Sequence, residues 1–306
     1  QRTVGIVPLK LIYSHLRLFL PKKVSGVPPT AANANRWKAK TMFSYYGSKS
    51  KVINLYPSPK FGKVIEPFCG SARYALKYFD RDVLIMDKYD VVIKIWQYLQ
   101  QASEKDILGL PEPKDKESID NYNLSEGERL LMGFMVWRGT AKPQKIVQPD
   151  SNIPKAKKVI ASQLYKIRHW VIRQGSYSEI ENQEATWFID PPYQVAYGQH
   201  YAGERIDYAL LGEWCKSREG QAIVCESVEA TWLPFSKLRK TSGNWSSTTE
   251  GIWSNLSHDF LSSQLSLFTP SNTACSGLVE SSAPQRESTL KKLSARRVLS
   301  QPATNR

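Results

Sequence analysis

The stretch Thr186-Trp187-Phe188-Ile189-Asp190-Pro191-Pro192-Tyr193 carries the strongest indication of fold class in this chain. Its first four residues are β-branched or aromatic, which suits a pleated, covered surface, so they predict a buried strand. Two prolines then end the strand, because neither can donate a hydrogen bond to a sheet ladder and each fixes its own φ. The sequence therefore predicts a rigid loop at the carboxyl end of a strand, where open α/β sheets bind their ligands.

This loop offers hydrogen-bond acceptors beside an aromatic ring. Pro191 and Pro192 have no N–H group, which leaves the Asp190 carboxylate and nearby backbone carbonyls next to Tyr193. A planar amine could donate two N–H bonds to these acceptors while its ring stacks on Tyr193. Accepting those bonds draws the nitrogen lone pair out of conjugation and makes the nitrogen nucleophilic. The alternative is a Pro-rich turn in which Asp190 only caps the loop.

A second segment, residues 63–76, predicts a strand, a tight loop of small residues and then a helix. This is the layout of the first βα turn in nucleotide-binding folds. Asp87 ends another apolar run, residues 83–86, and lies 21 positions after Glu66. An acid about 20 residues along is the expected ligand of the ribose hydroxyls. The glycines do not follow the GxGxxG pattern and the sequence contains no P-loop string, which argues against a dinucleotide and against phosphate binding by that route.

Composition predicts a soluble globular protein with a polyanionic partner. The 306 residues allow one or two domains, and 41% hydrophobic residues suffice for a packed core. The formal net charge of +14 favours nucleic acid as the partner. The alternative is a basic surface that only aids solubility, which would produce the same net charge. The cysteines are widely spaced without a metal-ligand pattern, so we expect reduced thiols, no metal and a cytoplasmic setting: Cys69, Cys215, Cys225 and Cys275.

Three motifs occur in a suggestive order: Tyr45-Tyr46-Gly47-Ser48-Lys49, Glu66-Pro67-Phe68-Cys69-Gly70 and Asp190-Pro191-Pro192-Tyr193. Together they resemble the Dam-type (D12 class) adenine-N6 DNA methyltransferases, of phage or prophage type. The resemblance implies an α/β fold, a Rossmann-like S-adenosylmethionine-dependent methyltransferase sheet with a small helical target-recognition insertion. It also implies site-specific methyl transfer to a flipped adenine in double-stranded DNA, with a cognate restriction endonuclease as a further candidate partner.

The resemblance also implies roles for individual residues. The residues expected at the S-adenosylmethionine site are Tyr45, Lys49, Glu66, Phe68, Gly70, Asp87 and Asp190. The residues expected to be catalytic are Asp190, Pro191, Pro192 and Tyr193. Asp190 and the Pro191 carbonyl would orient the adenine N6 amine, Tyr193 would stack on the base, and no metal would be needed. One departure is Ala72, which stands where the family usually has a second glycine and which disfavours a positive φ.

We expect a basic N-terminal extension or linker over residues 1–40, a methyltransferase domain over residues 41–255 and a disordered tail over residues 256–306. The target-recognition insertion would span about residues 100–184. An apolar patch over residues 9–20 is too short and too charged for a membrane span, so no membrane is expected. Residues 194–205 are rich in Gly and Tyr, which predicts a lid over the base.

The insertion is expected to contain two helices. Ser125 and Glu128 form a capping-box pattern before an apolar helix, and a second helix is predicted over about residues 156–174, ending at Gly175. The basic residues of this region fit phosphate contacts, or else the solvated face of helices that pack on the sheet, or both: Arg138, Lys142, Lys145, Lys155, Lys157, Lys158, Lys166, Arg168, His169 and Arg173.

Other functions remain open from the sequence. A cytosine-N4 methyltransferase shares the geometry but usually carries Ser where this chain has Asp190. An RNA or protein-amide methyltransferase uses related loops. A non-catalytic DNA-binding relative would keep affinity for DNA without binding the cofactor.

Overall fold

The structure is a computed structural model that describes residues 41–50, 52–194, 206–242 and 247–256. The expected N-terminal extension, nearly all of the expected lid and, apart from residue 256, the expected tail lie outside these residues. The strands are β1 Lys63–Glu66, β2 Asp82–Asp87, β3 Val171–Gln174, β4 Ala185–Ile189, β5 Gly220–Ser227, β6 Ser236–Ser242 and β7 Ser247–Ser254. The α-helices are α1 Arg73–Lys77, α2 Asp90–Gln101, α3 Glu104–Gly109, α4 Glu126–Met135, α5 Ile153–Ala161 and α6 Tyr208–Lys216, and the 3-10 helices are η3 Ile53–Leu55, η4 Ile119–Asn121, η5 Leu164–Ile167 and η6 Tyr177–Glu179.

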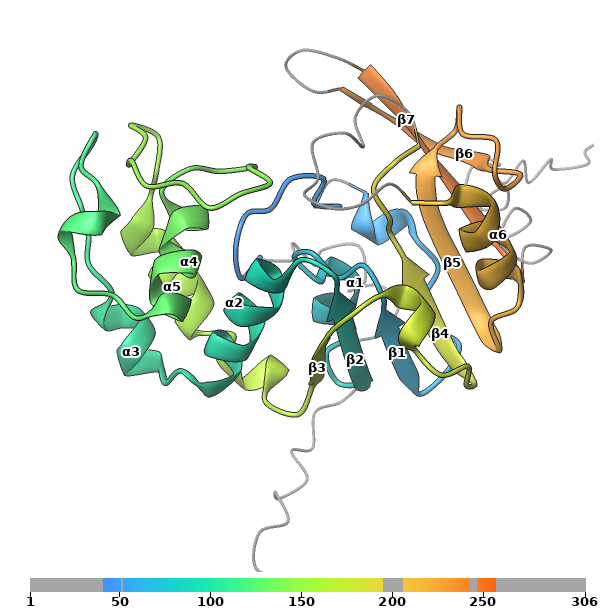
Figure 1. Cartoon of the computed structure of the whole chain (residues 1–306), viewed down its shortest axis with the longest axis horizontal. Helices are drawn as coiled ribbons and strands as arrows, with labels where there is room; N and C mark the ends of the chain where they lie inside the picture. The colour runs from blue at the N-terminus through green and yellow to red at the C-terminus, as the bar shows by residue number, and fades with distance from the viewer. Residues whose placement is uncertain (1–40, 51, 195–205, 243–246, 257–306) are drawn as a thin grey trace, which may run out of the picture. The chain divides into compact units, whose positions relative to one another are not determined.

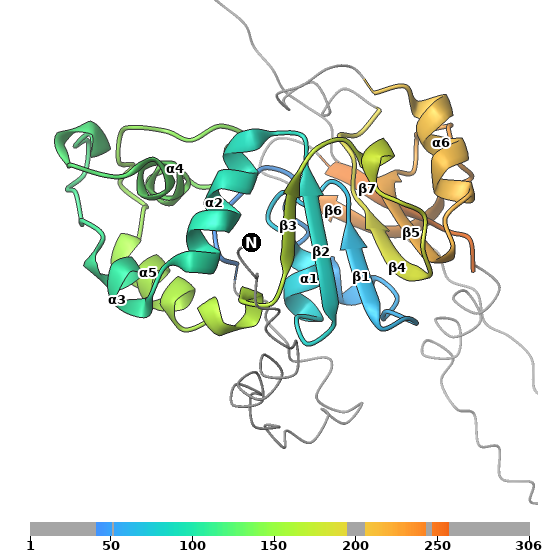
Figure 2. The same ribbon diagram turned by 60° about the horizontal axis from the view of Figure 1, so that its bottom comes forward.

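Seven strands form one sheet in the order β3-β2-β1-β4-β5-β7-β6 (Figures 1 and 2). The first five run parallel, and β7 lies antiparallel to both β5 and β6. The order of the parallel strands reverses between β1 and β4, as it does in doubly wound nucleotide-binding folds. This arrangement confirms the expected Rossmann-like α/β class.

Both faces of the sheet are covered. Because side chains alternate along a strand, Val64 and Val83 pack into the core shared with α1 and α2, whereas Ile65 and Leu84 pack on the opposite side with Leu211 of α6. Strands covered on both faces are continuously apolar rather than alternating. All five residues of β4 are accordingly buried, and the buried strand predicted from the sequence is confirmed.

Three further helices between β2 and β3, namely α3, α4 and α5, lie on the side of α2 away from the sheet (Figure 1). Here α4 packs on α2, and α5 packs on α3. The expected capping box is present, since the Ser125 hydroxyl accepts the Glu128 N–H and the Glu128 carboxylate accepts the Ser125 N–H. Reciprocal capping of this kind stabilises the first turn of α4.

The second helix predicted over residues 156–174 is wrong in its extent. Helix α5 ends at Ala161, η5 follows, and Val171 begins β3, which pairs in parallel with β2. Val171 and Ile172 are β-branched and prefer an extended backbone, and β2 supplies the ladder that they need. Gly175 follows a strand and not a helix, and its N–H continues the pairing with β2 by donating to the Asp87 carbonyl at 3.1 Å. The sheet therefore resumes inside the range expected for the insertion.

Candidate functional site

A cavity of about 720 Å³ opens where the strand order reverses. The loops that follow β1, β2 and β4 meet there because the carboxyl ends of parallel strands share one edge of a sheet. The volume lies within the range typical of small-molecule sites, roughly 300–1,000 Å³. The cavity is lined by nine of the residues singled out from the sequence: Tyr45, Lys49, Glu66, Phe68, Gly70, Asp87, Asp190, Pro192 and Tyr193. Pro191 is buried in the loop and is not among the lining residues.

The loop after β1 is tied to the end of β2. Gly70 has a φ of +43° and donates its N–H to Asp87 Oδ2 at 2.9 Å, while Asp87 Oδ1 accepts the Tyr89 N–H at 3.0 Å. A Cβ on Gly70 would lie 3.1 Å from the Tyr45 ring, so this approach and the positive φ both favour glycine. Burial raises the pKa of Asp87, and its two backbone hydrogen bonds oppose that rise.

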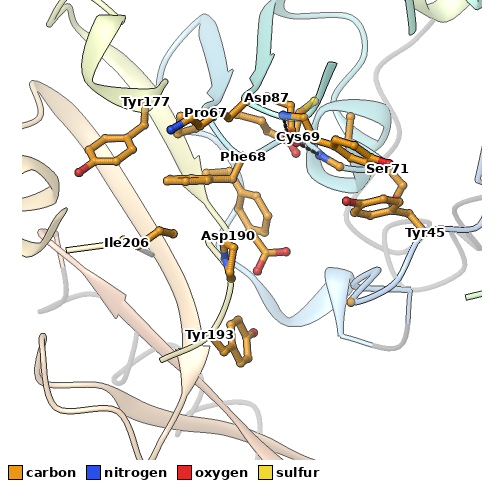
Figure 3. A pocket seen from close by; sticks show the side chains of 18 of the residues that line it. Tyr45, Pro67, Phe68, Cys69, Ser71, Asp87, Tyr177, Asp190, Tyr193 and Ile206 are labelled. Atoms are coloured by element: carbon orange, nitrogen blue, oxygen red, sulfur yellow. Dashed lines mark hydrogen bonds between the residues drawn. The ribbon is translucent and has the colours of Figure 1, made fainter. Parts of the chain in front are cut away.

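An aromatic wall stands beside this loop. The rings of Phe68 and Tyr177 lie 5.3 Å apart and both residues line the cavity (Figure 3). Tyr177 belongs to η6, just after β3, so the carboxyl end of β3 brings it to this edge of the sheet. Aromatic faces at this spacing suit contact with a flat, apolar ligand surface.

Glu66 also stabilises the start of α1. It is 2% exposed, and its carboxylate accepts the Ala75 N–H within the first turn of α1. This bond satisfies a backbone donor that a helix start otherwise leaves unpaired. Burial raises the pKa of Glu66 well above its usual value.

A charged cluster lies at the other end of the cavity. Lys49 Nζ is 2.7 Å from Asp190 Oδ1 and 3.8 Å from Glu250 Oε1, and it lies 4.7 Å from the centre of the Tyr193 ring. Glu250 Oε1 also accepts the hydroxyls of Tyr193 at 2.6 Å and Tyr56 at 2.5 Å. Sequence reasoning missed Glu250 and Tyr56. No local motif marks either residue, and the pairing of β7 with β5 brings Glu250 into place.

The pKa of Asp190 is raised to about 6. Burial is the largest cause, the Lys49 ammonium opposes the rise, and the Glu250 carboxylate adds to it. The pKa of the Tyr193 phenol is also raised, by burial first and then by the carboxylates of Asp190 and Glu250. At neutral pH the site therefore presents an ionised Asp190 beside a neutral Tyr193 that donates to Glu250.

The loop after Asp190 is held from two sides. The Tyr208 hydroxyl of α6 donates to the Pro192 carbonyl at 2.7 Å. Glu226, which is fully buried at the end of β5, accepts the Gln194 N–H and the Trp232 Nε1–H, each at 3.0 Å. These contacts fix the loop against the sheet, and the sequence contained no motif for them.

Several cations in the range expected for the insertion have structural partners. Buried Lys157 donates to the Leu110 carbonyl at 2.6 Å and pairs with Glu112, and buried Lys166 donates to Gln163. Arg168 donates to the Ala102 carbonyl at the end of α2, and Lys145 pairs with Asp120. Among the described basic residues of this region, the following are also exposed: Arg138, Lys142, Lys155, Lys158 and Arg173. Phosphate contacts by these side chains stay a prediction.

Three further observations concern only the part of the chain that the structure describes. None of its helices has the length and apolar character needed to cross a bilayer. It contains no group of three or more His, Cys, Asp or Glu residues placed to bind a metal ion. Cys69, Cys215 and Cys225 are buried free thiols, and Cys275 lies beyond the described ranges.

Comparison with known proteins does not assign the chain to a family. No protein-family model matches the chain. No curated protein matches it either. Among solved structures, a protein named "Putative methyltransferase yhhF" from Escherichia coli is similar at 10% identity with a TM-score of 0.28, covering 62% of this chain and 74% of that chain. A likeness this remote carries no argument, so the fold class rests on the sheet order.

Proposed function

We propose that this protein is an S-adenosylmethionine-dependent methyltransferase that acts on the exocyclic N6 amine of a flipped adenine in double-stranded DNA. The observation that carries the proposal is the pairing of a buried Asp190 carboxylate with Lys49, beside Tyr193, in a cavity of cofactor size. This arrangement offers an anionic acceptor and an aromatic ring to a planar amine.

The residues along the other part of the cavity fit the cofactor. The Asp87 carboxylate accepts two backbone N–H bonds and keeps further acceptor capacity for the ribose hydroxyls. Phe68 and Tyr177, whose rings contact each other, would together form one wall against the adenine ring. Glycine at position 70 avoids a Cβ that would lie 3.1 Å from the Tyr45 ring. When bound, the cofactor supplies an electrophilic methyl group on a sulfonium.

The chain's own contribution is to position and polarise the amine. Above a pH of about 6 Asp190 is ionised and accepts an N–H bond, while Lys49 stabilises that ionised form. Holding the amine in line with the methyl group converts an encounter of two reactants into a positioned one. After transfer, the amine proton leaves to water or to Asp190.

DNA as the substrate is supported by charge. The chain carries a formal net charge of +14, and Arg138, Lys142, Lys155 and Lys158 are exposed on the insertion. Such cations bind phosphates independently of sequence and would hold the duplex while the base is flipped, which costs a few kcal/mol.

The test follows tritiated methyl from S-adenosylmethionine into duplex DNA, with the nucleosides separated afterwards. Label in N6-methyladenine that is lost in Asp190→Ala and retained in Asp80→Ala, an exposed acid outside the cavity, is the expected result. Label in N4-methylcytosine would change the base and keep the chemistry. No label in DNA, despite measured cofactor binding, would reject DNA as substrate and direct the search to RNA or protein.

A further inference from the structure

A buried guanidinium lines the cavity, and the described part of the chain offers it no hydrogen-bond partner. Arg73 is the first residue of α1, is 6% exposed and lines the cavity beside Ser71 and Ala72. Its Nε and Nη1 atoms are buried and have no hydrogen-bond partner among the residues that the structure describes. The sequence analysis assigned this side chain no role.

Such an arrangement is costly unless an anion enters the cavity. A guanidinium stays charged at any physiological pH and carries five N–H donors, so burying it unpaired is strongly unfavourable. Burial lowers the pKa of Arg73, and no neighbouring carboxylate opposes that effect. Glu66 and Asp87, whose carboxylates line the same cavity, bind backbone donors instead: Glu66 accepts the Ala75 N–H, and Asp87 accepts those of Gly70 and Tyr89.

The geometry of the fork restricts the ligand to a planar or tetrahedral oxyanion. Guanidinium groups bind carboxylates and phosphates through two parallel N–H bonds. The other buried cation that lines the cavity, Lys49, is paired with Asp190 and Glu250. Arg73 is therefore the buried cavity cation that is still available to an anionic group of a bound small molecule.

We propose that Arg73 binds the carboxylate of the amino-acid part of the cofactor. This inference rests on the proposed function, because S-adenosylmethionine carries one carboxylate and no other anionic group. With the adenosine part assigned to Asp87, Phe68 and Tyr177 and the methyl group directed toward Asp190, the amino-acid part requires a cation inside the same cavity. A duplex phosphate fits less well, because Arg73 is almost completely buried.

The experiment compares two ligands that differ in the amino-acid part. S-adenosylhomocysteine keeps the carboxylate, whereas 5′-methylthioadenosine lacks the whole amino-acid portion. Binding of each is measured by calorimetry on the full chain, on Arg73→Met and on Arg81→Met, an exposed arginine outside the cavity. We expect Arg73→Met to weaken S-adenosylhomocysteine binding by about 10- to 100-fold and to change 5′-methylthioadenosine binding by less than about twofold. Arg81→Met should change neither.

A second readout needs no ligand. Because methionine removes an unpaired buried charge at similar length, the melting temperature of ligand-free Arg73→Met should equal or exceed that of the original chain. A marked fall would show that the guanidinium has a structural partner and would overturn the inference.

The remaining outcomes separate this inference from the proposed function. If the original chain binds neither ligand, both fail together. If it binds both ligands and Arg73→Met weakens them equally, or if the two ligands bind the original chain with the same affinity, cofactor use stands and the carboxylate assignment is overturned. If Arg73→Met affects only DNA binding, the guanidinium serves a phosphate and the inference is again overturned.

Discussion

Lys49 and Asp190 form an ion pair with Nζ and Oδ1 2.7 Å apart, although one lies in the segment before β1 and the other follows β4. Their side chains are 8% and 21% exposed, so the pair is largely shielded from solvent. Glu250 Oε1 is 3.8 Å from the same Lys49 ammonium and accepts a hydrogen bond from the Tyr193 hydroxyl at 2.6 Å. Two carboxylates thus share one cation, and the ionisation of Asp190 depends on both neighbours.

The first prediction concerns the pH dependence of methyl transfer. Burial raises the pKa of Asp190 to about 6, and only the ionised form is a full acceptor for the substrate amine. Transfer rates should therefore be constant above that pH and fall tenfold per unit below it. Single-turnover rates measured between pH 5 and pH 8 test this expectation. A profile without an acidic limb would contradict the assigned role of Asp190.

Removing the Lys49 ammonium should move the acidic limb of the pH–rate profile to higher pH. In Lys49→Met the ammonium no longer lowers the pKa of Asp190, so the acidic limb should shift to higher pH. The rate at neutral pH should fall by about 10²-fold or more, since a preorganised charge at the reacting group is lost. Lys216→Met, at an exposed position in α6, is the matched control and should leave both limb and rate unchanged.

Glu250→Gln should shift the limb in the opposite direction. Glu250 raises the pKa of Asp190, so loss of its charge should lower that pKa and move the acidic limb to lower pH. The amide oxygen can still accept from Tyr56 and Tyr193, which keeps the local geometry. Opposite shifts in Lys49→Met and Glu250→Gln would establish electrostatic coupling, whereas shifts in the same direction would indicate a rearranged site.

Much of this site follows from local sequence because its parts lie at strand ends. The apolar run before Asp190 and the two prolines predict a buried strand and its sharp end, and parallel pairing then brings Asp190, Phe68 and Asp87 to one edge. Gly70 is predictable for the same reason, since the turn after β1 needs a residue that tolerates a positive φ.

What sequence reasoning missed depends on long-range pairing. Glu250 reaches the loop because β7 pairs antiparallel with β5, and Glu226 reaches it because β5 pairs in parallel with β4. Neither position has a local pattern that reveals its partner. The segment containing Val171 was expected to be helical, because the ladder offered by β2 is invisible in the sequence. Lys157 is buried only because Glu112 and the Leu110 carbonyl lie against it. Burial of charge is a tertiary property.

Gly70→Ala should damage both stability and cofactor binding. Alanine at a φ of +43° is strained, and its Cβ would press on the Tyr45 ring at 3.1 Å. We expect a loss of about 1–2 kcal/mol in the free energy of unfolding and weaker binding of S-adenosylhomocysteine. The control is Gly62→Ala, because nothing lies within 4 Å of a Cβ there and its φ is not in the left-handed region. Urea denaturation of both variants measures the difference, and equal losses would contradict the argument.

Substitutions at Ala72 measure the backbone strain in the turn between β1 and α1. It adopts the left-handed conformation, with φ 43° and ψ 50°, and is fully buried at the start of α1. Ala72→Gly relieves about 1 kcal/mol of backbone strain and loses about 0.8 kcal/mol of methyl burial, so its free energy of unfolding should change by less than about 1 kcal/mol.

Ala72→Val should instead lower the free energy of unfolding by more than about 2 kcal/mol. A β-branched residue is strongly disfavoured at a positive φ, and two further methyl groups would overfill a site with no exposed surface. Urea denaturation of the three forms gives the ranking. If valine were tolerated as well as glycine, the backbone at this position would have to leave the left-handed region, and the turn that brings Gly70 to Asp87 would not need the conformation seen here.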